Sequence, residues 1–261
     1  MTTSHELAAR LMQWHDERRP FIPFAKQAGI ADLNAAYDVQ DTFVAHCRQR
    51  RQSQAIGYKV GLTSPRMQAM CGIDTPVAGV VLAADVHPSS ASIPLGNYVH
   101  LGIEFEIGVR MGRDLDAGQL PTSLAEMAEA VDAVCPAVEL VDDRNADYKN
   151  FDVLSGVADN AWNAGAVLGE FHTEWPDLAE VKMTVERNGE VIDSGYGRDV
   201  LGHPFEPLLW LARHLADRGQ VLRRGDVVLT GSVVPTRFPS PGETYRMSLD
   251  GLGDVTLTLT A

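Results

Sequence analysis

Short strand-like runs, mostly separated by turn residues rather than by helices, are the feature that most constrains the fold of this chain. Helical spacing of apolar residues is confined to residues 4–12, 32–47, 124–134 and 207–219. The strand-like runs are residues 56–64, 79–86, 101–110, 137–141, 180–193, 195–201, 226–230, 243–249 and 254–259. Because helices and strands alternate only weakly, βαβ units are disfavoured. We therefore predict an α+β fold built on a mixed sheet that curls or closes.

Several local signals refine this prediction. Ser4 is expected to cap the first helix, and Pro136 is expected to end the helix at 124–134 before a strand begins. The segment from Pro88 to Ser92 is predicted to be a loop. Asn188 and Gly189 form the dipeptide that most strongly favours a two-residue hairpin turn.

Length and composition limit the classes of protein to consider. The 261 residues are enough for a single domain, residues 1–261, of which residues 1–55 form a mainly helical N-terminal part. The net charge of -13 argues against nucleic acid or an anionic membrane as a partner. It leaves a small anionic substrate possible, because a bound cation reverses the local field.

The cysteines and the N-terminal residues predict a cytoplasmic protein. The chain has three cysteines, an odd number with no C-x-x-C spacing, which fits a reducing compartment better than a disulfide framework. The first residues lack the apolar stretch of a secretory signal. No apolar run approaches the roughly 20 residues that a membrane-spanning helix needs.

The run LGIEFEIGVRMG at 101–112 places two carboxylates inside an apolar strand. Residues i and i+2 of a strand point to the same side, so Glu104 and Glu106 share a face and Phe105 occupies the other. Two unit charges about 5 Å apart repel by roughly 3 kcal/mol at an effective dielectric near 20. Such a pair needs either solvent, as on an exposed edge strand, or a cation.

A third acid favours the cation. Glu139 stands alone in the apolar segment PAVELV, and an acid flanked by apolar residues is rarely left unpaired in a core. Three carboxylates from two apolar strands suit a hard divalent cation, Mg²⁺ or Mn²⁺. Zinc is disfavoured, since no histidine or cysteine keeps ligand spacing with these acids.

Lys59 is a second candidate for chemistry. It lies in the apolar run GYKVGLTS at 57–64, just before a glycine turn. Its side chain either extends along the surface to reach water or faces the metal site. In the second arrangement, it would bind a carboxylate or donate a proton.

Several motifs, in this order along the chain, resemble those of the hydratase/decarboxylase branch of the fumarylacetoacetate hydrolase superfamily. They are GYKVGLTSPRMQAMCGIDTP, IEFE, PAVELVDDR, FDVLSGVADNA, LGHP and GDVVLTGS. The resemblance extends from about Asp32 to the C-terminus and covers the 2-keto-4-pentenoate hydratases and the 4-oxalocrotonate decarboxylases. The ordered set is specific for this branch, but it does not specify a substrate.

The resemblance implies a mixed β-roll with an N-terminal helical part, assembled as a homo-oligomer. It implies Mg²⁺ or Mn²⁺ held by Glu104, Glu106 and Glu139, the acids already selected from the strand pattern. It places the active-site lysine of the branch at Lys59.

The remaining site residues come from two further motifs. The ADNA motif contains Asp159 and Asn160, and the TGS motif contains Gly231 and Ser232; all four are predicted to bind substrate. At the end of a strand, the backbone N–H and the Ser232 hydroxyl could meet a substrate carboxylate.

Three departures from the branch bear on the substrate. Hydratases usually have P-D-[FY]-G where this chain has PVAG, so Val77 replaces an acid thought to help water addition. Decarboxylases tend to have an aliphatic residue there. An ungapped alignment puts Ala84 where a second acid is common, with Asp85 one residue later. Asp85 is our candidate catalytic acid, although one residue changes the face of a strand. Trp162 replaces a small residue and would reshape the pocket.

These observations predict a metal-dependent lyase acting on a short unsaturated 2-oxo or 2-hydroxydienoic acid in aromatic catabolism. Hydration of a 2-hydroxypenta-2,4-dienoate-like substrate is the leading prediction. The alternatives are decarboxylation of a 4-oxalocrotonate-like diacid, hydrolysis of an acylpyruvate, and a 2-oxo-acid-binding protein with reduced catalysis. Hydrolysis would require an acid–histidine dyad, which the N-terminal half does not display.

Overall fold

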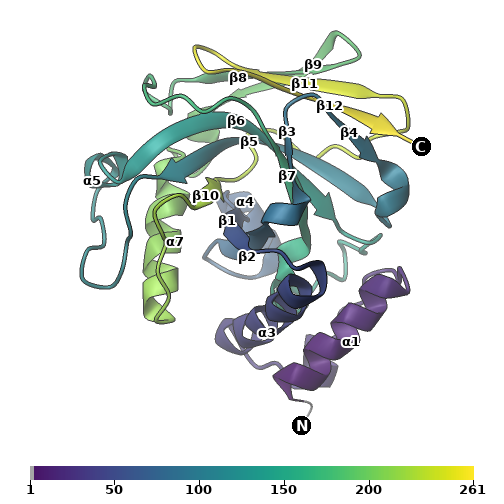
Figure 1. Cartoon of the computed structure of the whole chain (residues 1–261). Helices are drawn as coiled ribbons and strands as arrows, with labels where there is room; N and C mark the ends of the chain where they lie inside the picture. Colours follow the sequence, from purple (N-terminus) through teal and green to yellow (C-terminus); the bar gives the residue numbers. More distant parts are fainter. Residues whose placement is uncertain (1–2) are drawn as a thin grey trace.

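The computed structural model describes residues 3–261, which form two packed β-sheets with helices at one side (Figure 1). The helices are α1 (Ser4–Asp16), α2 (Ala25–Ala28), α3 (Leu33–Arg51), α4 (Pro65–Cys71), α5 (Leu124–Ala128), α6 (Val153–Ala158) and α7 (Phe205–Asp217). The strands are β1 (Ala55–Gly61), β2 (Val77–Leu82), β3 (Val86–Pro88), β4 (Ala91–Pro94), β5 (Leu101–Met111), β6 (Val131–Asp142), β7 (Asn163–Leu168), β8 (Lys182–Arg187), β9 (Glu190–Tyr196), β10 (Val227–Leu229), β11 (Thr244–Leu249) and β12 (Gly253–Thr260). The mixed α/β architecture confirms the predicted fold class.

The larger sheet has seven strands in the order β2-β1-β10-β5-β6-β7-β3. It curls, because β2 at one edge lies against β7, which is next to the other edge. The long antiparallel pair β5–β6 forms its centre. The sequence-based expectation of a sheet that curls is therefore confirmed.

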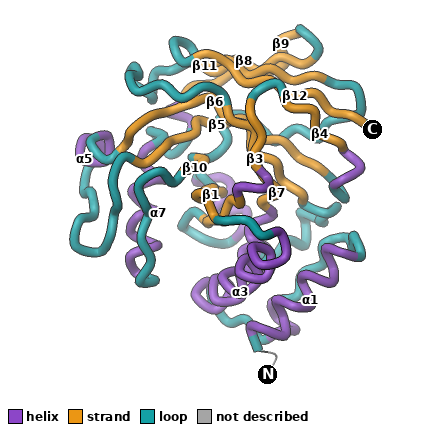
Figure 2. Tube along the Cα trace, in the orientation of Figure 1, coloured by secondary structure: helices purple, strands orange, loops and turns teal. Residues whose placement is uncertain are grey.

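The smaller sheet has five strands in the order β4-β12-β11-β8-β9 and covers one face of the larger sheet (Figure 2). Strand β12 lies against β6 and β7, and the ring centroids of Phe105 on β5 and Tyr245 on β11 are 6.0 Å apart. Ile103, Phe105 and Ile107 are fully buried in this core. One face of β5 thus packs between the sheets, and the other face is left for the acids.

An asparagine side chain completes the curl. The Asn160 side-chain amide donates to the carbonyl of Val80 at 2.9 Å, and its oxygen accepts from the N–H of Val80 at 2.7 Å. It therefore imitates the backbone of a neighbouring strand along β2. On the same strand, Gln40 of α3 donates to the Ala78 carbonyl, and the Ala78 N–H donates to the hydroxyl of Tyr37. These bonds attach the helices to an edge that would otherwise be open.

The helix predicted at 124–134 is wrong in its second half. Helix α5 ends at Ala128 and β6 begins at Val131, so Pro136 lies inside a strand. Its carbonyl accepts from Gly169, beyond the end of β7 at Leu168, so the missing N–H breaks no bond between β6 and β7. The segment is apolar and buried on both faces, and that pattern does not distinguish a strand from a buried helix.

Smaller corrections concern caps and loops. Thr3, rather than Ser4, caps α1: its hydroxyl accepts from the N–H of Glu6, whose carboxylate accepts from the Thr3 N–H. The predicted loop from Pro88 to Ser92 contains the end of β3 and the start of β4. The hairpin prediction is confirmed, since Asn188 and Gly189 both have positive φ and connect β8 to β9. No helix among residues 3–261 has the length and apolar character required to cross a membrane.

Candidate metal centre

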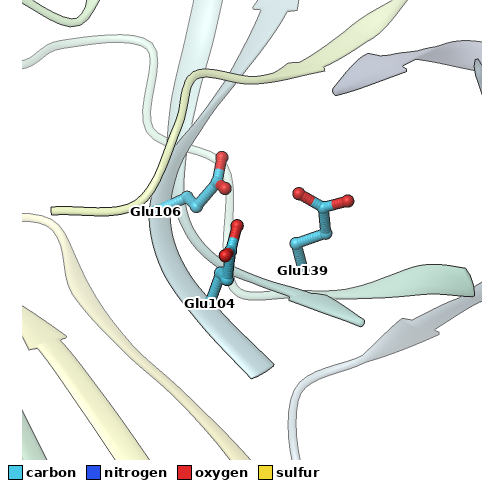
Figure 3. A group of neighbouring side chains, drawn as sticks. All are labelled: Glu104, Glu106 and Glu139. Carbon is cyan, nitrogen blue, oxygen red and sulfur yellow. The ribbon is translucent and has the colours of Figure 1, made fainter. Parts of the chain in front are cut away.

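The three predicted acids meet inside the curl of the larger sheet (Figure 3). Glu104 and Glu106 project from one face of β5, and Glu139 on β6 is the direct pairing partner of Glu104. One carboxylate oxygen from each lies within 4.8 Å of the other two. Glu106 and Glu139 are fully buried, so this face is not the solvated edge that an E-x-E pair alone would allow.

The residues next to the acids on this face of the sheet are small. On the same face, Glu106 pairs with Ala137, and Gly108 pairs with Cys135. A Cβ atom at Gly108 would lie 2.8 Å from the Cys135 sulfur, so this position is already tightly filled without a side chain. The bulk on this face is therefore supplied mainly by the carboxylates.

Each acid has a distinct set of partners. Glu106 accepts from the backbone N–H of Gly231 at 2.6 Å, and Glu104 accepts from the hydroxyl of Thr236 at 2.5 Å. Glu139 accepts from the amide of Asn163 at 3.0 Å. These donors orient the carboxylates while leaving other oxygens unused.

Gly231 illustrates why this segment requires glycine. Its φ is +109°, and a Cβ atom would lie 2.1 Å from the hydroxyl of Thr63. Any side chain would displace the N–H that Glu106 accepts. The TGS motif therefore meets the acids through Gly231, and the substrate-binding role expected for Gly231 and Ser232 remains a prediction.

Lys59 lies beside Glu139, with 3.2 Å between its Nζ atom and a carboxylate oxygen. Burial alone would lower the pKa of Lys59, but the negative charges of Glu139, Glu104 and Glu106 outweigh it and raise the pKa. The side chain is almost completely buried, so the alternative of a lysine reaching along the surface to water is wrong. Lys59 is a protonated donor within the acid cluster.

The acids remain in excess of the positive charge. Burial is the largest cause that raises the pKa of Glu106, followed by the charges of Glu139 and Glu104. Burial also raises the pKa of Glu139, although Lys59 opposes the shift. One oxygen on each of these two side chains, Oε1 of Glu106 and Oε2 of Glu139, is buried without a hydrogen-bond partner. Unpaired buried carboxylate oxygens fit ligands for a cation.

A cavity of about 530 Å³ opens onto this cluster. Lys59, Glu104 and Ser232 contribute polar groups to its lining, and Arg66 is a further cation. Much of the remaining lining is apolar and includes Met67, Met70, Val77, Val153, Phe151, Trp162 and Phe238. The cavity has the size and mixed polarity of a small-molecule site.

Comparisons with known proteins agree with this geometry. Residues 59–260 match the family described as fumarylacetoacetate (FAA) hydrolase C-terminal. The chain belongs to this family. The resemblance to its hydratase/decarboxylase branch is confirmed by two relatives with these named activities. A 2-keto-4-pentenoate hydratase of Paraburkholderia xenovorans (strain LB400) is 34% identical over 255 residues, covering 96% of this chain and 92% of the relative. A 4-oxalocrotonate decarboxylase of Pseudomonas putida is 33% identical over 210 residues, covering 80% and 78%.

A solved structure of the same kind has the same fold. The 4-oxalocrotonate decarboxylase from Pseudomonas putida G7, complexed with magnesium and adipate, superposes with a TM-score of 0.90. The sequences are 30% identical, and the match covers 98% of this chain and 97% of the relative. These relatives are enzymes, so the chain lies within an enzyme branch of the FAA hydrolase family.

Three other predicted site residues do not line the cavity that opens onto the acids in this FAA hydrolase family member. Asp159 is fully buried, forms an ion pair with Arg144, and its Oδ1 atom lies 2.7 Å from His15 Nε2. Asn160 closes the sheet along β2, as described above. Asp85 forms an ion pair with Arg51 of α3. Their predicted roles in substrate binding and catalysis remain predictions, and the contacts they make are structural.

Sequence reasoning missed two residues that hold the acids. Asn163 is in the segment ADNAWNAG that carries the family motif, so its proximity to the acids had a signal in the sequence. Thr236 follows Val234 and Pro235 in an irregular loop with no periodic pattern, and only the tertiary fold brings it to Glu104. Loops of this kind place side chains that no helix or strand period reveals.

Proposed function

We propose that this protein is a divalent-metal-dependent lyase that acts on a short unsaturated 2-oxo or 2-hydroxydienoic acid. Hydration of a 2-hydroxypenta-2,4-dienoate-like substrate to a 4-hydroxy-2-oxo acid is the leading reaction. The observation that carries the proposal is the group of three acids, Glu104, Glu106 and Glu139, at a small-molecule cavity with Lys59 beside them.

The acids fit Mg²⁺ or Mn²⁺ as the bound cation. All three offer hard oxygen ligands, and two of those oxygens are buried without partners. Burial is the largest cause of the raised pKa values of Glu106 and Glu139, with charge from the neighbouring acids as a further cause, and a divalent cation would oppose both. When bound, it would supply a Lewis acid for the carboxylate and 2-oxygen of the substrate and stabilise enolate charge.

The residues of the chain supply the other functions. Lys59 holds a proton at Nζ, where it can hydrogen-bond the substrate carboxylate or deliver the proton to a carbon of the dienolate. The Ser232 hydroxyl donates to the Val234 carbonyl at 2.7 Å, and its oxygen accepts from the Phe105 N–H at 3.1 Å, which fixes this wall of the cavity against β5. Apolar walls from Val77, Val153 and Phe151 restrict water around the tail.

Decarboxylation of a 4-oxalocrotonate-like diacid is the second candidate. Val77 is buried and lines the cavity, at the position where the sequence comparison places an acid in hydratases. Loss of a carboxylate as CO₂ is favoured by apolar surroundings, so Val77 suits a decarboxylase at this position better than an acid would. Arg66 also lines the cavity and could bind an additional carboxylate. The solved decarboxylase that covers nearly the whole chain supports this alternative as well.

Broader properties follow from the proposed family role. We propose a homo-oligomeric, cytoplasmic enzyme of aromatic catabolism, with no nucleic-acid or membrane partner. We also propose that residues 1–261 form one domain, because buried residues of α1 and α3 join those of both sheets in one apolar core. Size-exclusion chromatography with light scattering would measure the oligomeric state.

An ultraviolet assay with Mg²⁺ or Mn²⁺ tests the function directly. The purified protein is offered 2-hydroxypenta-2,4-dienoate and 4-oxalocrotonate in separate reactions, and CO₂ is monitored. EDTA-sensitive loss of dienoate absorbance without gas supports the hydratase, whereas gas from the diacid supports the decarboxylase. No turnover of either, together with tight binding of oxalate or pyruvate, would support a binding protein with reduced catalysis.

A further inference from the structure

A second cavity, of about 440 Å³, lies between the N-terminal helices and the curled sheet. We refer to the cavity of about 530 Å³ at the acids as the substrate cavity. Unlike that cavity, the second has a lining rich in charged and polar groups, including His15, Arg18, Arg51, Asp85, Tyr98 and Asp159. Among the residues that line the two cavities, Trp162 alone is common to both. Trp162 therefore lies between the two spaces, and we call it the partition.

The backbone that carries Trp162 is held in an unusual conformation. Asn160, Ala161 and Trp162 have φ values of +54°, +47° and +58°, three consecutive non-glycine residues in the left-handed region. This conformation is costly for residues with a side chain and persists only where the surroundings enforce it. Here, Asp159 is fixed by Arg144 and His15, and Asn160 is fixed along β2. The partition is thus built from a rigid segment.

The Trp162 ring is packed as firmly as its backbone. Ring centroids lie 5.0 Å away in Phe21 and 4.9 Å away in Phe151, and Tyr148 approaches edge-on at 6.0 Å. The indole N–H is buried without a hydrogen-bond partner. An unpaired buried donor is unfavourable, and phenylalanine would avoid it if only packing mattered. The extra size of the indole is therefore the feature that requires explanation.

The next residue connects this partition to the metal centre. Asn163 donates to Glu139 at 3.0 Å and also lines the second cavity. Because Trp162 and Asn163 are adjacent, one peptide unit fixes the position of the partition relative to a proposed metal ligand. A substrate whose carboxylate end is held at the acids therefore meets this partition at a fixed distance.

We infer that Trp162 is a specificity-determining residue that closes the substrate cavity against the second cavity and limits substrate length. Replacing the indole with a small side chain would join the two spaces and admit 2-oxo acids with longer tails. Because the second cavity is polar, the tails that benefit most would end in a carboxylate. This inference rests on the proposed function, because it assumes that a 2-oxo acid binds at the three acids.

The test is a binding series with Mg²⁺ present and no turnover required. Calorimetry measures the Kd of 2-oxoglutarate, 2-oxoadipate and 2-oxosuberate, which differ only in chain length, for the wild type and for Trp162→Ala. Each additional buried methylene strengthens binding about fourfold where space exists. We expect the ratio of the 2-oxosuberate Kd to the 2-oxoglutarate Kd to fall at least about tenfold in Trp162→Ala.

Two further variants distinguish this role from a general enlargement of the substrate cavity. Met70→Ala widens the substrate cavity at a residue that lines this cavity alone, and it should leave the ratio unchanged. Trp162→Phe keeps a ring in the partition, should fold even if the alanine variant does not, and should lower the ratio less than Trp162→Ala does. An unchanged ratio in folded Trp162→Ala, an equal fall in Met70→Ala, or a full fall in Trp162→Phe would overturn the inference. Wild-type protein that binds no 2-oxo acid would instead refute the proposed function and, with it, the inference.

Discussion

Two buried groups of charged residues in this protein have opposite electrostatic character. In the first, Glu104, Glu106 and Glu139 face one another with Lys59 as their only close cation among the described residues. In the second, Asp159 lies between Arg144 and His15. Both groups contain carboxylates that are essentially inaccessible to water.

The pKa shifts of the two groups differ in sign. Burial and the neighbouring acids raise the pKa of Glu106. Burial also acts to raise the pKa of Asp159, but the charges of His15 and Arg144 outweigh it and lower the pKa. A buried carboxylate with a lowered pKa is satisfied by the protein itself. A group of carboxylates with raised pKa values lacks positive charge, which a bound cation would supply.

The comparison separates stability from function. The Asp159 group fixes the segment that carries Asn160, Trp162 and Asn163, and it contains few unsatisfied atoms: only the Arg144 Nε atom lacks a partner. The acid group has unpaired oxygens on two of its members. We therefore expect substitutions in the Asp159 group to lower the free energy of unfolding, and those in the acid group to weaken metal binding.

The largest expected effect is on stability, in Asp159→Asn. This change removes the negative charge and leaves the Arg144 guanidinium buried without its counterion. Breaking a buried ion pair from one side costs about 3–5 kcal/mol. Urea unfolding followed by circular dichroism measures the loss, with Asp193→Asn, at a half-exposed ion pair with Arg237, as the control. A loss below about 1 kcal/mol would mean that the Asp159 group is not structural.

Glu139→Gln should chiefly affect metal binding. The substitution keeps the shape and removes one of three negative ligands, and it also removes the ion-pair partner of Lys59. Replacing groups that only support metal ligands already costs about 10–100-fold in affinity, so we expect a loss of at least about 100-fold. Calorimetric titration of Mn²⁺ into the two proteins measures it, and Glu243→Gln, outside the cavity, serves as the control. Metal binding that survives this change and the equivalent changes at Glu104 and Glu106 would exclude these acids as ligands.

The two groups were not equally predictable from the sequence. A strand period of two places Glu104 and Glu106 on one face, and an isolated acid in an apolar run identifies Glu139, so simple periodicity led to the acid group. The partners of Asp159 are 15 and 144 residues away along the chain. No local pattern connects His15 on the first helix to a turn before β7.

Tertiary context also explains the error at 124–134. Val131, Val134 and Pro136 lie in a strand because both faces of β6 are covered, one by the second sheet and the other by the interior of the curl. The apolar spacing fits a helix equally well, and Pro136 is tolerated only because β7 ends beside it. The sequence showed that Trp162 is unusual for the branch. Its role as a partition depends on two cavities, and these can be found only in the folded structure.

A smaller effect is expected from Asn163→Ala. The Asn163 amide donates to Glu139 and is not one of the three proposed ligands, so its loss would remove orientation rather than a ligand. Outer partners of metal ligands typically contribute about 10–100-fold to affinity or activity. We expect a loss in this range for Mn²⁺ affinity, with the fold intact by circular dichroism. Thr236→Val tests the equivalent contact at Glu104, and unchanged affinity in both variants would show that the acids need no orienting donors.

The smallest expected effect is a pH dependence that distinguishes the two groups. Because the folded pKa of Asp159 lies below its ordinary value of 3.8, its ionised form stabilises the protein above that pH. This stability is lost as the pH falls below 3.8 and through the lowered folded pKa. The difference in unfolding free energy between wild type and Asp159→Asn should therefore stay constant from about pH 7 to about pH 5 and shrink as the pH falls further toward about 3. A tenfold difference in proton affinity between the folded and unfolded chains corresponds to about 1.4 kcal/mol. Urea titrations of both proteins across this range measure it. A constant difference would mean that folding leaves the proton affinity of Asp159 unchanged, and would contradict the lowered pKa.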